Sequence, residues 1–185
     1  MRRDRLLLLL VVLAILLLGG YLVLRKLSDA EEARLSTVRP EVRNAFGRLR
    51  AFMAAEGIEL FVVSGGRTAA EQMAKVTAGL SGTGAQSWHL LGRAIDFNVG
   101  IRDPATGKLR ADNKAEDVAA YRKVHAAAGV FGFRGIPNGS PFKPDGTRAY
   151  ITNAAGNPLW DVFHLEYTGG MTFAEAKARD GRAVT

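Results

Sequence analysis

The segment SWHLLGRAID, residues 87–96, is the most informative stretch of this 185-residue chain. His89 and Asp96 are seven positions apart, a separation that would place them on opposite faces of one flat strand. Gly92 offers a bend between them, and the alternating residues 94–99 predict a strand after that bend. With the bend, both side chains can point to the same place.

A second segment, WDVFHLE at residues 160–166, also sets a histidine among carboxylates. A zinc-dependent hydrolase needs three protein ligands and an open position for water. Because the chain has no cysteine, His and carboxylate side chains must supply them. His89, Asp96 and His164 are the predicted ligands, whereas His125, in the expected helix 114–128, has no such carboxylate context and is interpreted as a plain helix residue.

The spacing Ser87-x-His89-x-x-Gly92-x-Ala94-x-Asp96 resembles the zinc motif of the VanY-type D-alanyl-D-alanine carboxypeptidase and L-alanyl-D-glutamate endopeptidase family. The upstream segment SGGRT, residues 64–68, is similar to the Ser-Gly-x-Arg segment of that family. Residues 161–166 resemble its third motif, Asp-x-x-His-x-Glu. The three motifs occur in the family's order and strengthen the prediction of a metal site.

This resemblance implies a hedgehog-type α+β domain that binds one zinc ion and hydrolyses the stem peptides of peptidoglycan. It implies that Asp161 is the general base and that Arg67 is the electrophilic partner of the scissile carbonyl. Ser87 and Gln72 would contact the substrate. Glu166 is the second choice for the base, or a residue that orients a ligand, because in a regular strand it shares a face with His164 whereas Asp161 does not.

The branch of the family is less clearly indicated. Carboxypeptidases that resemble this chain usually have Glu-Pro-Trp-His where residues 161–164 read DVFH, which favours the L-alanyl-D-glutamate endopeptidase. A D-alanyl-D-alanine carboxypeptidase and a catalytically silent wall-binding module of the same fold are the alternatives. The scattered positive charges and the apolar N-terminus argue against a nucleic-acid partner.

Periodicity predicts helices packed on a small antiparallel sheet. Apolar residues at three- and four-residue steps predict a helix over residues 40–56, and β-branched residues predict a strand over 58–63. Thr68 and Glu71 have the spacing of a capping box for a helix to about residue 78. The remaining expected elements are a helix at 114–128, strands at 130–133 and 159–167, and a closing helix at 172–179.

The N-terminus carries an uncharged run of 19 residues, 6–24, after a basic flank at residues 1–5. A helix of that length nearly spans a hydrocarbon core of about 30 Å, so we expect a transmembrane anchor rather than a cleaved signal peptide. Residues 25–37 are the expected tether, and residues 38–185 the peptidase domain. We expect a monomer whose catalytic domain lies in the periplasm or outside the cell, with secretion after signal cleavage as the alternative.

Overall fold

The computed structural model describes residues 29–81, 86–103, 105–110, 117–136, 139–153 and 156–180. The chain divides into two compact units, Met1–Ala33 and Arg34–Thr185. The predicted anchor, residues 6–24, lies outside the described residues. Among the helices that the structure does describe, none has the length and apolar character needed to cross a membrane.

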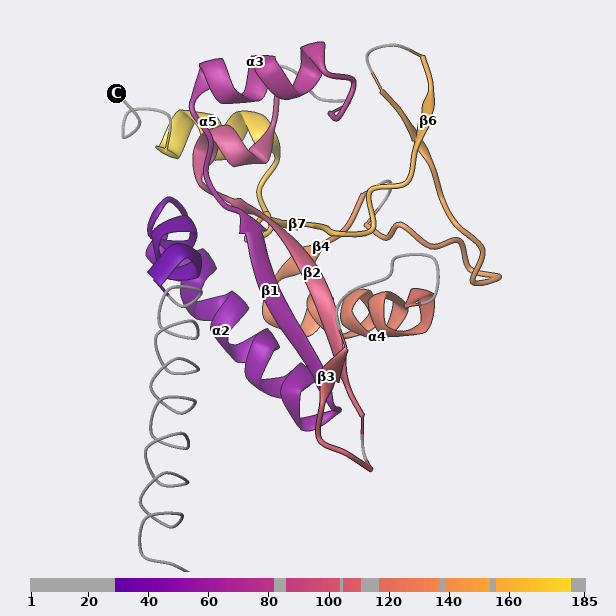
Figure 1. Ribbon diagram of the computed structural model, residues 1–185. Coiled ribbons are helices and arrows are strands. Elements are labelled where there is room, and N and C mark those ends of the chain that lie inside the picture. The colour runs from indigo at the N-terminus through magenta and orange to yellow at the C-terminus, as the bar shows by residue number, and fades with distance from the viewer. Residues whose placement is uncertain are drawn as a thin grey trace, which may run out of the picture. The chain divides into compact units, whose positions relative to one another are not determined.

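The centre of the second unit is an antiparallel sheet with the strand order β1-β2-β7-β4 (Figure 1). These strands are β1 (Ile58–Ser64), β2 (Ala94–Arg102), β7 (His164–Tyr167) and β4 (Phe133–Arg134), and the short β3 (Leu109–Arg110) also pairs with β2. Strands β5 (Ile151–Thr152) and β6 (Pro158–Leu159) form a separate two-stranded sheet. The α+β class predicted from the sequence is confirmed.

Two helices, α2 (Pro40–Ala55) and α4 (Val118–Ala128), bury their apolar stripes in the core they share with the sheet. In α2 the buried side chains recur at three- and four-residue steps, as helical periodicity requires: Val42, Ala45, Phe46, Leu49 and Met53. Pro40 stands at the first turn, where its missing N–H costs nothing, and Gly57 follows the helix with a φ of 74°. The helix predicted over residues 40–56 is confirmed.

Helices α3 (Ala69–Thr77) and α5 (Phe173–Asp180) lie beyond one end of strands β1 and β2 (Figure 1). Thr68 caps α3 as predicted, because its hydroxyl accepts from the Glu71 amide and the Glu71 carboxylate accepts from the Thr68 amide. A buried ion pair between Arg93 and Asp180 fastens α5 to the segment before β2. This end of the sheet carries residues 87–96, which include His89 and Asp96.

Two strand predictions were wrong in part. Residues 129–131 form a 3₁₀ turn, η2 (Gly129–Phe131), and Gly132 follows in the left-handed conformation, so only Phe133 of the expected strand 130–133 is extended. The expected strand 159–167 is interrupted by a turn at residues 162–163. In a regular strand Asp161 and His164 would lie on opposite faces. The turn at residues 162–163 allows both side chains to line the same cavity.

Candidate metal centre

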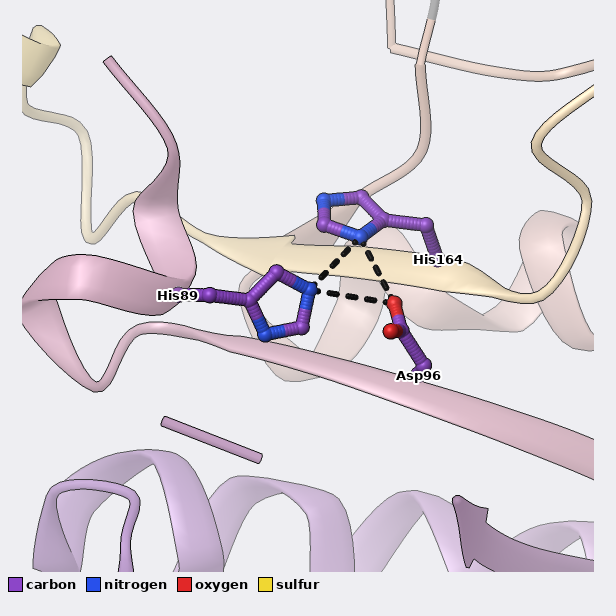
Figure 2. Close-up of side chains that lie close together, drawn as sticks. All are labelled: His89, Asp96 and His164. Atoms are coloured by element: carbon purple, nitrogen blue, oxygen red, sulfur yellow. Dashed lines mark hydrogen bonds and ion pairs between the residues drawn. The ribbon is translucent and has the colours of Figure 1, made fainter. Parts of the chain in front are cut away.

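Three side chains meet at the end of the sheet (Figure 2). His89 Nε2 lies 3.0 Å from Asp96 Oδ1 and 3.2 Å from His164 Nδ1, and His164 Nδ1 lies 3.0 Å from the same Asp96 oxygen. All three residues are buried. They form a group that could hold a metal ion, with one donor atom from each residue.

The local fold explains why side chains so far apart in sequence converge. His89 stands on a 3₁₀ turn, η1 (Trp88–Leu91), which ends at Gly92 with a φ of 63°. The left-handed Gly92 reverses the chain into β2, which carries Asp96. Strand β7 pairs with β2 so that His164 is directly opposite Asp96. The bend predicted at Gly92 is therefore present.

The hydrogen bonding of His89 directs a lone pair into the centre. Its Nδ1 lies 2.5 Å from the Gly65 carbonyl oxygen, which can only accept, so Nδ1 carries the proton. Burial lowers the pKa of His89 and favours the neutral ring. Its Nε2 thus presents a lone pair toward the carboxylate oxygen of Asp96, an arrangement that a cation between the two atoms would satisfy.

The spacing of the donor atoms fits zinc. In a tetrahedral site with bonds of about 2.0–2.1 Å, donor atoms lie about 3.3 Å apart. His89 Nε2, Asp96 Oδ1 and His164 Nδ1 form a slightly tighter triangle of donor atoms, with edges of 3.0, 3.0 and 3.2 Å. Two imidazoles and one carboxylate are also a donor set that zinc takes in hydrolytic sites.

The surrounding charges favour a cation at this place. Burial alone would lower the pKa of His164, but the hydrogen bond to Asp96 and the nearby carboxylates of Glu166 and Asp161 raise it to about 10. Burial also opposes the ionisation of Asp96, yet the neighbouring histidines lower its pKa overall. The electrostatic potential at the centre is therefore negative. It stabilises positive charge there, either as a proton or as a metal ion.

Arg67, which is partly buried, and Gln72, which is buried, support the centre through hydrogen bonds. Arg67 Nη2 donates to Asp96 Oδ2, its Nη1 donates to Gln72 Oε1 at 3.2 Å, and its Nε donates to Ser64 Oγ at 3.1 Å. Gln72 is only 1% exposed and donates to Ser81 Oγ at 2.9 Å. Gln72 was predicted to contact the substrate. In the structure its side chain hydrogen-bonds Arg67 and Ser81.

Asp161 lines a small cavity of about 30 Å³ beside the centre. Ser87, Arg67 and all three candidate ligands also line this cavity, which exceeds the roughly 10–15 Å³ that one water molecule needs. The buried Asp161 Oδ1 has no hydrogen-bond partner among the described residues. Burial raises the pKa of Asp161 to about 6, against the opposing charge of His164.

Glu166 occupies a different position from Asp161. Its Oε1 lies 3.5 Å from His164 Nε2, the ring nitrogen that faces away from the triangle. Its Oε2 accepts from Arg134 Nε at 3.0 Å. Glu166 therefore sits where it can orient the His164 ring, with Arg134 holding the carboxylate.

His125 has a larger role than its sequence context indicates. The residue is partly buried, and its Nε2 donates to the Val162 carbonyl at 2.6 Å, within the turn between Asp161 and His164. Its ring also lies near the rings of Phe97 and Phe142. No local pattern could have shown this contact, because it joins residues 37 positions apart.

We expect His125 to make the fold sensitive to acid. Burial lowers its pKa to about 4, so the unfolded chain takes up a proton near pH 6.5 and the folded chain does not. The contribution of His125 to the free energy of unfolding is therefore constant above pH 6.5, and the free energy falls by about 3 kcal/mol as the pH drops to 4. Urea unfolding with a chelator present, at pH 7 and pH 4.5, should show a smaller loss for His125→Gln than for the wild type. Equal losses would contradict this assignment.

Comparison with known proteins finds no match among protein-family models or curated proteins. Several solved structures are similar to the chain. Three of them are the LdcB LD-carboxypeptidase (20% identity, TM-score 0.46), a vancomycin-resistance D,D-pentapeptidase VanY in complex with Zn(II) (19%, 0.45) and the Serratia marcescens L-Ala D-Glu endopeptidase ChiX (20%, 0.45). The matches cover 80%, 75% and 78% of this chain, and 65%, 83% and 88% of the other chains.

The three neighbours are a carboxypeptidase, a pentapeptidase and an endopeptidase. At TM-scores below 0.5 this likeness is distant and assigns no function to the chain. The protein is thus an α+β protein with a buried His–Asp–His centre that could hold a metal ion.

Proposed function

We propose that the chain is a zinc-dependent peptidase with a hedgehog-type fold that hydrolyses peptidoglycan stem peptides. The observation that carries the metal assignment is the triangle of donor atoms from His89, Asp96 and His164. The imidazole of His89 is fixed by the Gly65 carbonyl in the tautomer that ligation requires. Zinc bound there would polarise a scissile carbonyl and acidify a water molecule.

The residues around the cavity have distinct roles in this proposal. Asp161 accepts a proton from the attacking water at its unpartnered Oδ1 and passes it to the leaving amine. Arg67 has N–H groups beyond those bound to protein, and these stabilise negative charge that develops on the scissile carbonyl. Glu166 orients His164, and Ser87 contacts the substrate from the cavity wall.

The substrate assignment comes from the three sequence motifs. The DVFH segment at residues 161–164 favours cleavage between L-alanine and D-glutamate over removal of a terminal D-alanine. We further propose that residues 6–24 anchor the chain in a membrane, with the catalytic unit outside the cytoplasm, where peptidoglycan is found. The basic balance of 25 Lys and Arg against 18 Asp and Glu suits contact with anionic wall polymers.

Mass spectrometry of muropeptides digested by the zinc-loaded full-length chain, purified in mild detergent, tests the function. We expect products cut after L-alanine, and none in a parallel digest with a chelator. Loss of only the terminal D-alanine would assign the chain to the carboxypeptidase branch. Bound zinc without any cleavage would contradict the peptidase and favour a silent wall-binding module.

A further inference from the structure

The segment before α2, residues 34–39, packs tightly against the two glycines that precede Arg67. We call this segment the strap. A Cβ atom on Gly65 would overlap the carbonyl oxygen of Arg34, and a Cβ atom on Gly66 would overlap that of Thr37. Because the overlapping atoms belong to the backbone, neither glycine can gain a side chain without moving the strap.

One peptide group links the strap to the candidate centre. The carbonyl of the Gly65–Gly66 peptide accepts from His89 Nδ1 at 2.5 Å, and the N–H of the same peptide donates to Thr37 Oγ1 at 2.7 Å. The Thr37 hydroxyl in turn donates to the Arg34 carbonyl at 2.6 Å, which fixes its rotation and leaves a lone pair for Gly66. A continuous hydrogen-bond chain therefore runs from Arg34 to the ring of His89.

This series of hydrogen bonds sets both the position and the strength of the hydrogen bond between His89 Nδ1 and the Gly65 carbonyl. A peptide N–H that donates to a hydroxyl makes the carbonyl of that peptide a better acceptor, since hydrogen bonds in series polarise one another. A better acceptor holds the Nδ1 proton more firmly and makes Nε2 a stronger donor of its lone pair to a metal. The far end of the strap is fixed as well, because the Arg39 amide donates to the Gly92 carbonyl at 3.0 Å.

We propose that Thr37 is a positioning residue for the metal centre: it holds the Gly65–Gly66 peptide in the orientation that fixes the His89 tautomer. The inference rests on the proposed zinc binding and adds a residue that lies 52 positions before the ligand it serves. Thr37 itself touches neither the metal nor the substrate in this account.

The test compares Thr37→Val with Thr37→Ser in the full-length chain, with zinc affinity measured by competition with a chromophoric chelator. Valine puts a methyl group where the hydroxyl was and also keeps water away from the Gly66 amide, whereas serine keeps the hydroxyl. Loss of a group that hydrogen-bonds a metal ligand directly weakens metal affinity about 10- to 100-fold. We expect about tenfold, the lower end of that range, for Thr37→Val, because Thr37 is exposed and acts on His89 through the Gly65–Gly66 peptide. Thr37→Ser should bind zinc like the wild type.

A second measurement separates positioning from general stability. In the zinc-loaded protein, the NMR signal of the His89 Nδ1 proton should move in Thr37→Val and stay in place in Thr37→Ser. If Thr37→Val only lowers the unfolding temperature of the metal-free chain, and keeps both the zinc affinity and the signal of the wild type, the inference is wrong. If the wild type itself binds no zinc, the proposed function fails, and that outcome is seen before any variant is compared.

Discussion

The His164→Ala variant is expected to lose stoichiometric zinc and to hydrolyse stem peptides at least about 10³-fold more slowly than the wild type. Removing one of three ligands leaves His89 and Asp96 alone, and the several kcal/mol that a metal contributes to transition-state stabilisation is lost with it. Metal content measured by mass spectrometry, together with initial rates on purified muropeptides, checks both parts.

His125→Gln is the matched control, because the histidine it removes lies outside the donor triangle. This variant should retain one zinc per chain. A His164→Ala protein that keeps both its zinc and its activity would show that the donor triangle is not the catalytic centre.

The Asp161→Asn variant should keep its zinc but lose about 10²- to 10⁴-fold in kcat, the contribution typical of a general base. Asparagine retains the shape of the side chain and cannot take up the proton. In the wild type, kcat/KM should fall as the pH drops through the pKa of Asp161, which burial raises to about 6 and the charge of a bound zinc would lower. The midpoint of this acid limb is therefore expected at or below pH 6.

Glu166→Gln distinguishes the two carboxylates. Because Glu166 faces the outer nitrogen of His164, its replacement should weaken zinc affinity about 10- to 100-fold, as for other residues that orient a metal ligand. Rates at saturating zinc should stay much closer to the wild type than those of Asp161→Asn. The reverse pattern would make Glu166 the base.

Local sequence signals were sufficient where a structure depends on neighbouring residues. The apolar period of residues 40–56 specifies a buried helical face, and the Thr68–Glu71 pair specifies where α3 begins. The bend at Gly92 followed from the faces of a strand, because His89 and Asp96 could not otherwise meet.

Features that depend on distant contacts were not predictable in this way. The apolar residues 130–133 resemble a strand, but Gly132 takes a left-handed conformation and packs against the ring of Tyr167, so the chain forms a turn there. The bond from His125 to Val162 and the strap over Gly65 and Gly66 join segments that only the tertiary fold brings together.

Gln72 shows the same limit within the site. A glutamine five residues after Arg67, near the start of a helix, has no local signal for burial. The structure places it between Arg67 and Ser81, where it holds the guanidinium that pairs with Asp96. Its burial depends on Ser81, nine positions further along the chain, whose hydroxyl oxygen accepts from Gln72 Nε2.

A zinc-edge anomalous X-ray measurement on crystals of the zinc-loaded protein tests the metal assignment most directly. We predict one peak, about 2.0–2.2 Å from His89 Nε2, Asp96 Oδ1 and His164 Nδ1, with a further position facing Asp161. A well-ordered zinc bound elsewhere, or a crystal in which these three side chains turn away from one another with zinc in excess, would contradict the account.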